Sequence, residues 1–125
     1  VMPGLVAFDF GDAIRAGANT AAEDERDLSN VALDIDKFEA FTRGFLGVDK
    51  DALTEAEIDS LAGGALAMTV ECGVRFLTDY LDGDKYFSVD YETHNLVRAR
   101  CQLALAKDMI AHFDEMKEIV KKYAE

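Results

Sequence analysis

The strongest structural signal in the chain lies in residues 67–81, which read AMTVECGVRFLTDYL. If this stretch is helical, apolar side chains cover most of its circumference, which predicts a largely buried helix from about residue 65 to residue 81. One thin polar stripe remains at the spacings i, i+4, i+7, i+8 and i+11, which share one helical face. The stripe consists of Glu71, Arg75, Thr78, Asp79 and Asp82.

Two interpretations of this stripe stay open from the residues alone. Arg75 can pair with Glu71 one turn before it and with Asp79 one turn after it, which gives a ladder of salt bridges. Alternatively, the stripe is the polar wall of a small-molecule pocket. A guanidinium held by carboxylates is a rigid donor of several hydrogen bonds, and it suits sugar hydroxyls or phosphate.

Helical patterns continue on both sides of this stretch. Asp34 is a good N-cap for a second helix, and Thr54 with Glu57 has the pattern of a capping box. Only two short apolar runs, residues 5–8 and 86–89, are candidates for strands, and neither can build a sheet alone. The expected helices cover residues 9 or 12 to 16, 35 to 47, 54 to an interruption at Gly63 and Gly64, 65 to 81, and 91 to 123.

The fold class that follows is mainly α, in one domain over residues 1–125, with at most a short β remnant at the N-terminal edge. Half of the 125 residues are apolar, which is enough for a packed core. The formal net charge is −12, which argues against nucleic acid and against anionic membrane surfaces as partners.

The chain also lacks several signals that would indicate other classes. It has no apolar run of 18 residues and no signal peptide, so we expect no membrane span and a cytoplasmic location. Its two cysteines, Cys72 and Cys101, stand outside any Cys-x-x-Cys or Cys/His cluster, which predicts reduced thiols and no structural zinc.

Asp9-Phe10-Gly11 matches a protein-kinase motif in which the aspartate holds magnesium. The residues that follow read as a helix rather than an activation loop, so capping of that helix by Asp9 is the competing interpretation. His94 and His112 are isolated, which is typical of surface or capping residues. We expect Arg98 and Arg100 to pair with the acidic surface.

Five segments of the chain resemble the C-terminal part of the phosphotransferase family with the aminoglycoside-phosphotransferase, kinase-like fold. They cover nearly the whole chain, and the branch that they are most similar to is that of the N-acetylhexosamine 1-kinases. They are residues 1–15 (VMPGLVAFDFGDAIR), 19–25 (NTAAEDE), 68–81 (MTVECGVRFLTDYL), 83–87 (GDKYF) and 94–100 (HNLVRAR).

The resemblance implies that this chain is the helical part of a C-terminal lobe. The N-terminal lobe, the catalytic loop and the metal-holding aspartate would precede Val1, so we expect a fragment without catalytic residues or metal ligands of its own. The intact parent would use ATP and Mg²⁺ to phosphorylate a sugar at its anomeric hydroxyl, whereas this fragment would be inactive alone and hold no cofactor.

Site residues carried over from the resemblance are Arg75, as a contact to the sugar, and Asp9, as a brace for the catalytic loop. Asp12 would assist Asp9. Glu71 and Asp79 are added as substrate-binding residues because they share the helix face of Arg75.

Two other hypotheses remain. The chain could be a stand-alone helical interaction module without catalysis, and apolar surface at its N-terminal edge would then favour a homodimer. In a weaker alternative, Asp9 and Asp12 bind a metal ion directly.

Overall fold

The computed structural model describes the backbone of residues 3–125 and the side chains of residues 6–48 and 51–125. Val1 and Met2, which open the first segment of the family resemblance, lie outside the described residues. The chain is 74% helical, which confirms a mainly α fold. Within the described part no strand forms, and an isolated antiparallel bridge joins Asn19 to Leu33. The helices are α1 (Pro3–Gly17), η1 (Leu28–Asn30), α2 (Ile35–Asp49), η2 (Lys50–Ala52), α3 (Glu55–Asp59), α4 (Leu61–Leu81), α5 (His94–Ala111) and α6 (Phe113–Ala124).

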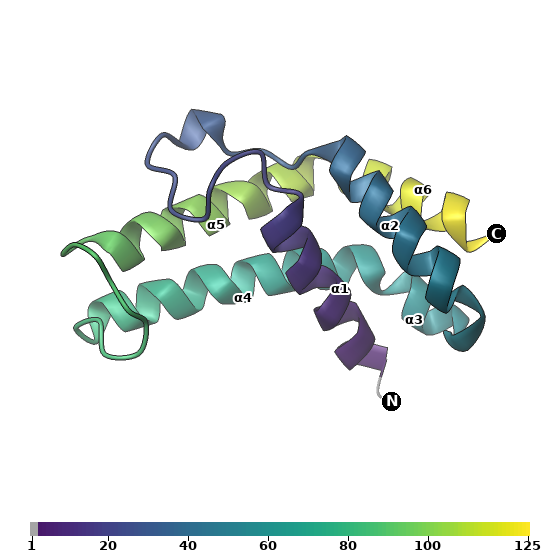
Figure 1. Cartoon of the computed structure of the whole chain (residues 1–125), viewed down its shortest axis with the longest axis horizontal. Coiled ribbons are helices and arrows are strands. Elements are labelled where there is room, and N and C mark those ends of the chain that lie inside the picture. The colour runs from purple at the N-terminus through teal and green to yellow at the C-terminus, as the bar shows by residue number, and fades with distance from the viewer. Residues whose placement is uncertain (1–2) are drawn as a thin grey trace.

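The central helix is α4, which packs most extensively against α1 and α5 (Figure 1). Helices α4 and α5 run side by side and are joined at one end by the loop of residues 82–93. Helix α1 crosses α4 close to the start of α4, at Gly64, and α2, α3 and α6 gather at the other end of the molecule. The core residues Phe10, Ile14, Leu61 and Leu105 lie where these two groups of helices meet.

Two glycines allow α1 and α4 to cross in close contact. A Cβ atom at Gly64 would lie 2.5 Å from the carbonyl oxygen of Ala7, and a Cβ at Gly11 would collide with the carbonyl of Gly64. The prediction that Gly63 and Gly64 interrupt the helix is therefore wrong. Both lie inside α4, and the break comes earlier, at Ser60.

Helix α1 begins earlier than the sequence analysis predicts. Proline is well tolerated in a first helical turn, and Ala7, Phe10 and Ile14 form one buried face. The β remnant expected at residues 5–8 is therefore absent from the described chain, since this run is helical. Asp9 is in the interior of α1, so the interpretation of Asp9 as a helix cap is also wrong.

The long helix predicted over residues 91–123 is two helices in the structure. At His112 the backbone turns (φ −112°, ψ 17°), and its N–H donates to the carbonyl oxygens of Asp108 and Met109. This turn lets α6 bury Met116 and Val120 against α2 and α3. The second strand candidate, residues 86–89, lies in the loop between α4 and α5.

Predictions that rest on local capping chemistry are confirmed. Thr54 Oγ1 accepts the N–H of Glu57 at 3.1 Å, while Glu57 Oε1 accepts the N–H of Thr54 at 2.9 Å. Asp34 Oδ1 accepts the N–H of Lys37 at 3.1 Å at the start of α2. Helix α4 ends at Leu81, and Gly83 follows with φ +91°.

Among the described helices, α4 is long and apolar enough to cross a membrane by length and composition, with a mean hydropathy of 1.2. This is weak evidence, because the core helix of a water-soluble fold has the same character. Only 39% of the apolar stretch of α4 is buried, so the prediction of a largely buried helix is wrong, although α4 packs against both α1 and α5.

Candidate functional site

A cleft of about 610 Å³ lies where α1, α4 and α5 meet the two long loops, residues 18–34 and residues 82–93. It brings Asp9 and Asp12 of α1 together with Arg75 of α4, although these residues were singled out from separate segments of the sequence. The cleft is lined by Phe8, Asp9, Asp12, Arg15, Glu23, Met68, Cys72, Arg75, Phe76, Phe87, Ser88 and Arg98.

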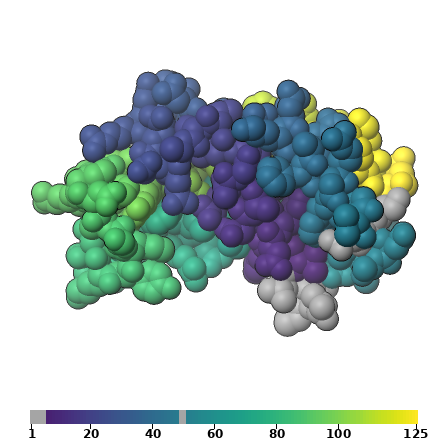
Figure 2. Space-filling model, viewed as in Figure 1, coloured from purple at the N-terminus to yellow at the C-terminus, as the bar shows by residue number. Residues whose placement is uncertain are grey.

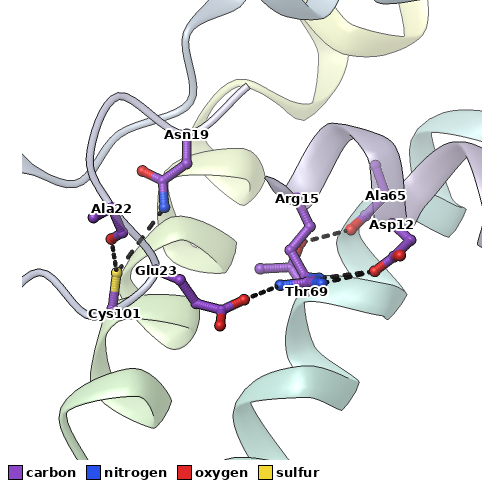
Figure 3. A network of polar contacts seen from close by, with 8 residues as sticks. All are labelled: Asp12, Arg15, Asn19, Ala22, Glu23, Ala65, Thr69 and Cys101. Carbon is purple, nitrogen blue, oxygen red and sulfur yellow. Dashed lines mark hydrogen bonds and ion pairs between the residues drawn. The ribbon is translucent and has the colours of Figure 1, made fainter. Parts of the chain in front are cut away.

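Arg15 organises the acidic side of this cleft (Figure 3). Its Nε and Nη2 donate to Asp12 Oδ1 at 3.1 and 2.8 Å, and its Nη1 donates to Glu23 Oε2 at 2.6 Å. Burial of the guanidinium lowers the pKa of Arg15, but the hydrogen bonds to Asp12 and Glu23 outweigh burial and raise that pKa. Arg15 therefore joins α1 to the loop of residues 18–34 as a permanent cation.

Asp9 differs from Asp12 in its surroundings. Its side chain is exposed and forms no hydrogen bond or ion pair with any residue that the structure describes. The carboxylate of Asp12, by contrast, is already held by Arg15. Among the residues described, the carboxylate of Asp9 is therefore left to accept hydrogen bonds from a ligand or another segment.

The surroundings of Arg75 agree with both interpretations left open by the sequence, a salt bridge and the wall of a pocket. Its Nε lies 3.5 Å from Glu71 Oε1, so the predicted pair with Glu71 forms, while the side chain keeps 64% of its surface exposed. An exposed pair at this spacing contributes only about 0.3–0.5 kcal/mol. The guanidinium also lines the cleft, where it is accessible to a ligand.

The carboxylate of Asp79 is engaged by the loop that follows α4 rather than by Arg75. Its side chain is buried, and Oδ1 accepts the N–H of Tyr86 at 2.8 Å. Oδ2 accepts the N–H of Phe87 at 3.0 Å and the side-chain amide of Asn95 at 2.8 Å. These bonds occupy the carboxylate that was expected to pair with Arg75, and they fix the loop of residues 82–93.

Hydrogen bonding outweighs burial at Asp79. Burial alone would raise the pKa of this carboxyl, but the N–H groups of Phe87 and Tyr86 and the amide of Asn95 lower it below its usual range. Asp79 is therefore ionised in the folded protein at neutral pH. A substrate-binding role for Asp79 stays a prediction, and the hydrogen bonds in the structure are those of a loop anchor.

The two long loops are fastened to each other, and Figure 2 shows them in contact. His94 Nε2 lies 2.9 Å from Asp24 Oδ2, while its Nδ1 accepts the N–H of Asp90 at 3.1 Å. The His94 ring stacks on the ring of Tyr91. The guanidinium carbon of Arg26 lies 4.5 Å from the centre of the same Tyr91 ring. The prediction of a surface or capping histidine is wrong for His94, which is 2% exposed.

Arg98 also departs from its expected role as a surface ion pair. Its Nη1 donates to the carbonyl oxygen of Ser88 at 2.9 Å and to Asn95 Oδ1 at 3.1 Å, and the guanidinium lies 5.6 Å from the centre of the Phe76 ring. No carboxylate pairs with Arg98 within 4 Å in the part of the chain that the structure describes. Arg98 is thus an ordered cation that lines the cleft.

The cysteines behave as reduced thiols. Both are free, and burial raises the pKa of Cys72 and of Cys101. Within the described residues, no group of three or more His, Cys, Asp or Glu side chains is arranged to hold a metal ion.

A larger hollow of about 960 Å³ lies between α3 and α6 at the opposite end of the molecule. Ile58, Ala62 and Val120 contribute apolar surface to its lining, and charged residues of α3 and α6 surround them. It contains none of the residues predicted to bind substrate. We place the candidate site in the smaller cleft because that cleft combines cations, carboxylates and aromatic rings.

No protein-family model matches this chain.

Sequence reasoning missed Arg15, Glu23 and Arg98 as parts of the site. Arg15 could have been found, because it follows Asp12 by three residues on one helix face. The approach of Glu23 depends on how the loop of residues 18–34 folds back, and no local pattern encodes this.

Proposed function

We propose that this chain is the helical part of the C-terminal lobe of an ATP-dependent sugar kinase similar to the N-acetylhexosamine 1-kinases, and that its cleft is the sugar-binding wall. The observation that carries the proposal is the meeting of Asp9 and Asp12 with Arg75 in one cleft. The family resemblance assigns substrate and catalytic-loop roles to these residues.

The chemistry of the cleft supports a polyhydroxylated ligand. Guanidinium groups donate to hydroxyl oxygens, carboxylates accept from hydroxyl hydrogens, and both kinds of group face the same space. Phe76 and Phe87, whose ring centres lie 4.7 Å apart, give the cleft an apolar surface beside these polar groups. A volume of about 610 Å³ lies within the ordinary range for small-molecule sites.

Asp9 has a defined place in this proposal. Its exposed carboxylate would accept hydrogen bonds from the catalytic loop of the parent enzyme, which would also supply the groups that hold ATP and Mg²⁺. The described residues would then bind and orient the sugar, while the transfer of the phosphoryl group to the anomeric hydroxyl occurs on the other lobe's side.

The proposal is tested by Arg75→Ala in the intact parent enzyme. We expect a KM for the sugar raised about tenfold or more, or a lower kcat, with an unchanged midpoint of thermal unfolding, because the ion pair of Arg75 is exposed. Arg43→Ala, an exposed arginine of α2 outside the cleft, is the matched control and should leave both constants unchanged. Loss of stability with normal kinetics would contradict the proposal, and so would phosphorylation of N-acetylhexosamines by residues 1–125 alone with ATP and Mg²⁺.

One observation favours the alternative of an interaction module. Phe8, beside Asp9 on α1, is 44% exposed, so apolar surface is present at the N-terminal edge as that hypothesis expects. A homodimer through this edge would bury Phe8 and cover Asp9. Light scattering of the chain with and without Phe8→Ser separates the two functions, because a sugar-binding wall requires no dimer.

A further inference from the structure

The three arginines of the cleft differ in how far their hydrogen-bonding capacity is used. Arg15 is neutralised by two carboxylates, and Arg75 lies next to Glu71. Arg98 instead touches only neutral acceptors, the carbonyl of Ser88 and the amide oxygen of Asn95. No carboxylate lies within 4 Å of this guanidinium among the described residues, and its charge acts at longer range on Asp24.

Arg98 is also held in place. Nη1 of Arg98 donates both hydrogen bonds, one to Ser88 and one to Asn95, and the guanidinium lies over the buried ring of Phe76. Asn95, its neighbour in this network, is itself fixed by donation to Asp79 Oδ2 and to Asp84 Oδ1 at 3.0 Å. The side chain therefore loses little further conformational entropy when a ligand binds.

The free edge of this guanidinium has the geometry for an anion. Nε and Nη2 of Arg98 have no hydrogen-bond partner in the described chain, and these two groups form the planar fork that binds carboxylate or phosphate in a bidentate way. Arg75, on the neighbouring helix α4, lines the same cleft and adds a second positive charge.

We propose that the basic side of the cleft, built on Arg98 with Arg75 beside it, is a subsite for an oxyanion carried by the ligand, best fitted by a phosphate monoester. The ligand of the cleft is then a phosphorylated sugar, with its phosphate toward Arg98. The sugar part of this inference rests on the proposed function, whereas the anion subsite rests on the arginines alone.

The test is a titration of the 125-residue chain with N-acetylglucosamine 1-phosphate, N-acetylglucosamine and inorganic phosphate, followed by calorimetry or amide NMR. We expect the sugar phosphate to bind about tenfold more tightly than the sugar, since a bidentate charged contact adds to the hydroxyl contacts. Arg98→Gln should remove this difference between the sugar phosphate and the sugar.

Arg100→Gln is the matched control, because it removes the same charge from the same helix at an exposed residue that faces a different hollow. It should keep the preference for the sugar phosphate. Equal losses in Arg98→Gln and Arg100→Gln would show a general charge effect and overturn the subsite. If Arg98→Gln fails to fold, Arg98→Lys replaces it, and an undiminished preference in that variant overturns the bidentate contact.

The titrations with inorganic phosphate and with the unphosphorylated sugar distinguish a failure of the anion subsite from a failure of the proposed function. Binding of phosphate that depends on Arg98, without any binding of the sugar, would support the subsite and contradict the sugar kinase. Binding of the sugar that depends on Arg75, with no gain from the phosphate, would overturn the subsite and leave the kinase proposal intact.

Discussion

Asp79 holds the loop that carries Phe87 and Ser88 to the cleft. Its carboxylate accepts two backbone N–H groups and the amide of Asn95, and the same asparagine continues the network to Arg98. Asp79 therefore shapes the cleft through its neighbours, and its direct contact with substrate stays a prediction. Substitution of Asp79 should therefore lower the free energy of unfolding of the protein.

Asp79→Asn should lower the free energy of unfolding by about 2–3 kcal/mol, because charge-assisted bonds are lost and an amide N–H₂ then faces N–H donors. Asp82→Asn, an exposed residue one turn later on the same helix end, is the control and should change the stability by less than about 0.5 kcal/mol. Urea unfolding monitored by circular dichroism measures both. Equal stability of the two variants would contradict the role assigned to Asp79.

The dependence of stability on pH provides a second readout of the same contact. The folded-state pKa of Asp79 is lowered, so its stabilisation is fully present above the unfolded-state pKa of about 3.9 and is lost as pH falls through the folded-state pKa. Asp24, whose pKa is lowered chiefly by its hydrogen bond with His94, contributes with the same sign. We expect stability to fall below about pH 4, with a shallower slope in Asp79→Asn and an unchanged slope in Asp82→Asn.

At the scale of elements, the crossing of α1 and α4 determines where the two walls of the cleft lie. Gly64→Ala should destabilise the protein by about 2–3 kcal/mol, because its Cβ would overlap the backbone of Ala7. Gly63→Ala, one residue earlier, meets nothing within 4 Å and should stabilise α4 by about 0.5–1 kcal/mol. Opposite shifts in the midpoint of thermal unfolding are expected, and shifts of the same sign would contradict this crossing.

The elements also show which features a sequence can predict. The capping box of Thr54 and Glu57 was predicted because its two hydrogen bonds join residues three apart. The start of α1, the passage of α4 through Gly63 and Gly64 and the turn at His112 were missed, since each depends on packing against a distant helix. From the local sequence, glycine predicts a break in the helix. The structure shows that Gly64 instead allows the backbone of α1 to approach α4 closely.

At the scale of the whole molecule, the cleft depends on contacts between two loops, residues 18–34 and residues 82–93, that are far apart in the sequence. Asp24 and Arg26 of one loop contact His94 of α5 and Tyr91 of the other loop, and this junction holds Glu23 near Arg15. The sequence could point to Arg75 and Asp9 as candidates through the family resemblance. It could not show that the carboxylate of Asp79 is used within the fold or that Arg98 faces the cleft, because those facts arise from loop closure.

The proposed function depends on the binding of a sugar in the cleft between α1, α4 and α5. The most direct test is a titration of the isotope-labelled chain with N-acetylglucosamine, followed residue by residue through its amide NMR shifts, which detects even millimolar affinity. We expect saturable shifts that cluster at Asp9, Arg75 and Phe87 and that become smaller in Arg75→Ala. Shifts confined to the hollow between α3 and α6, or no saturable shift anywhere, would contradict the proposed function.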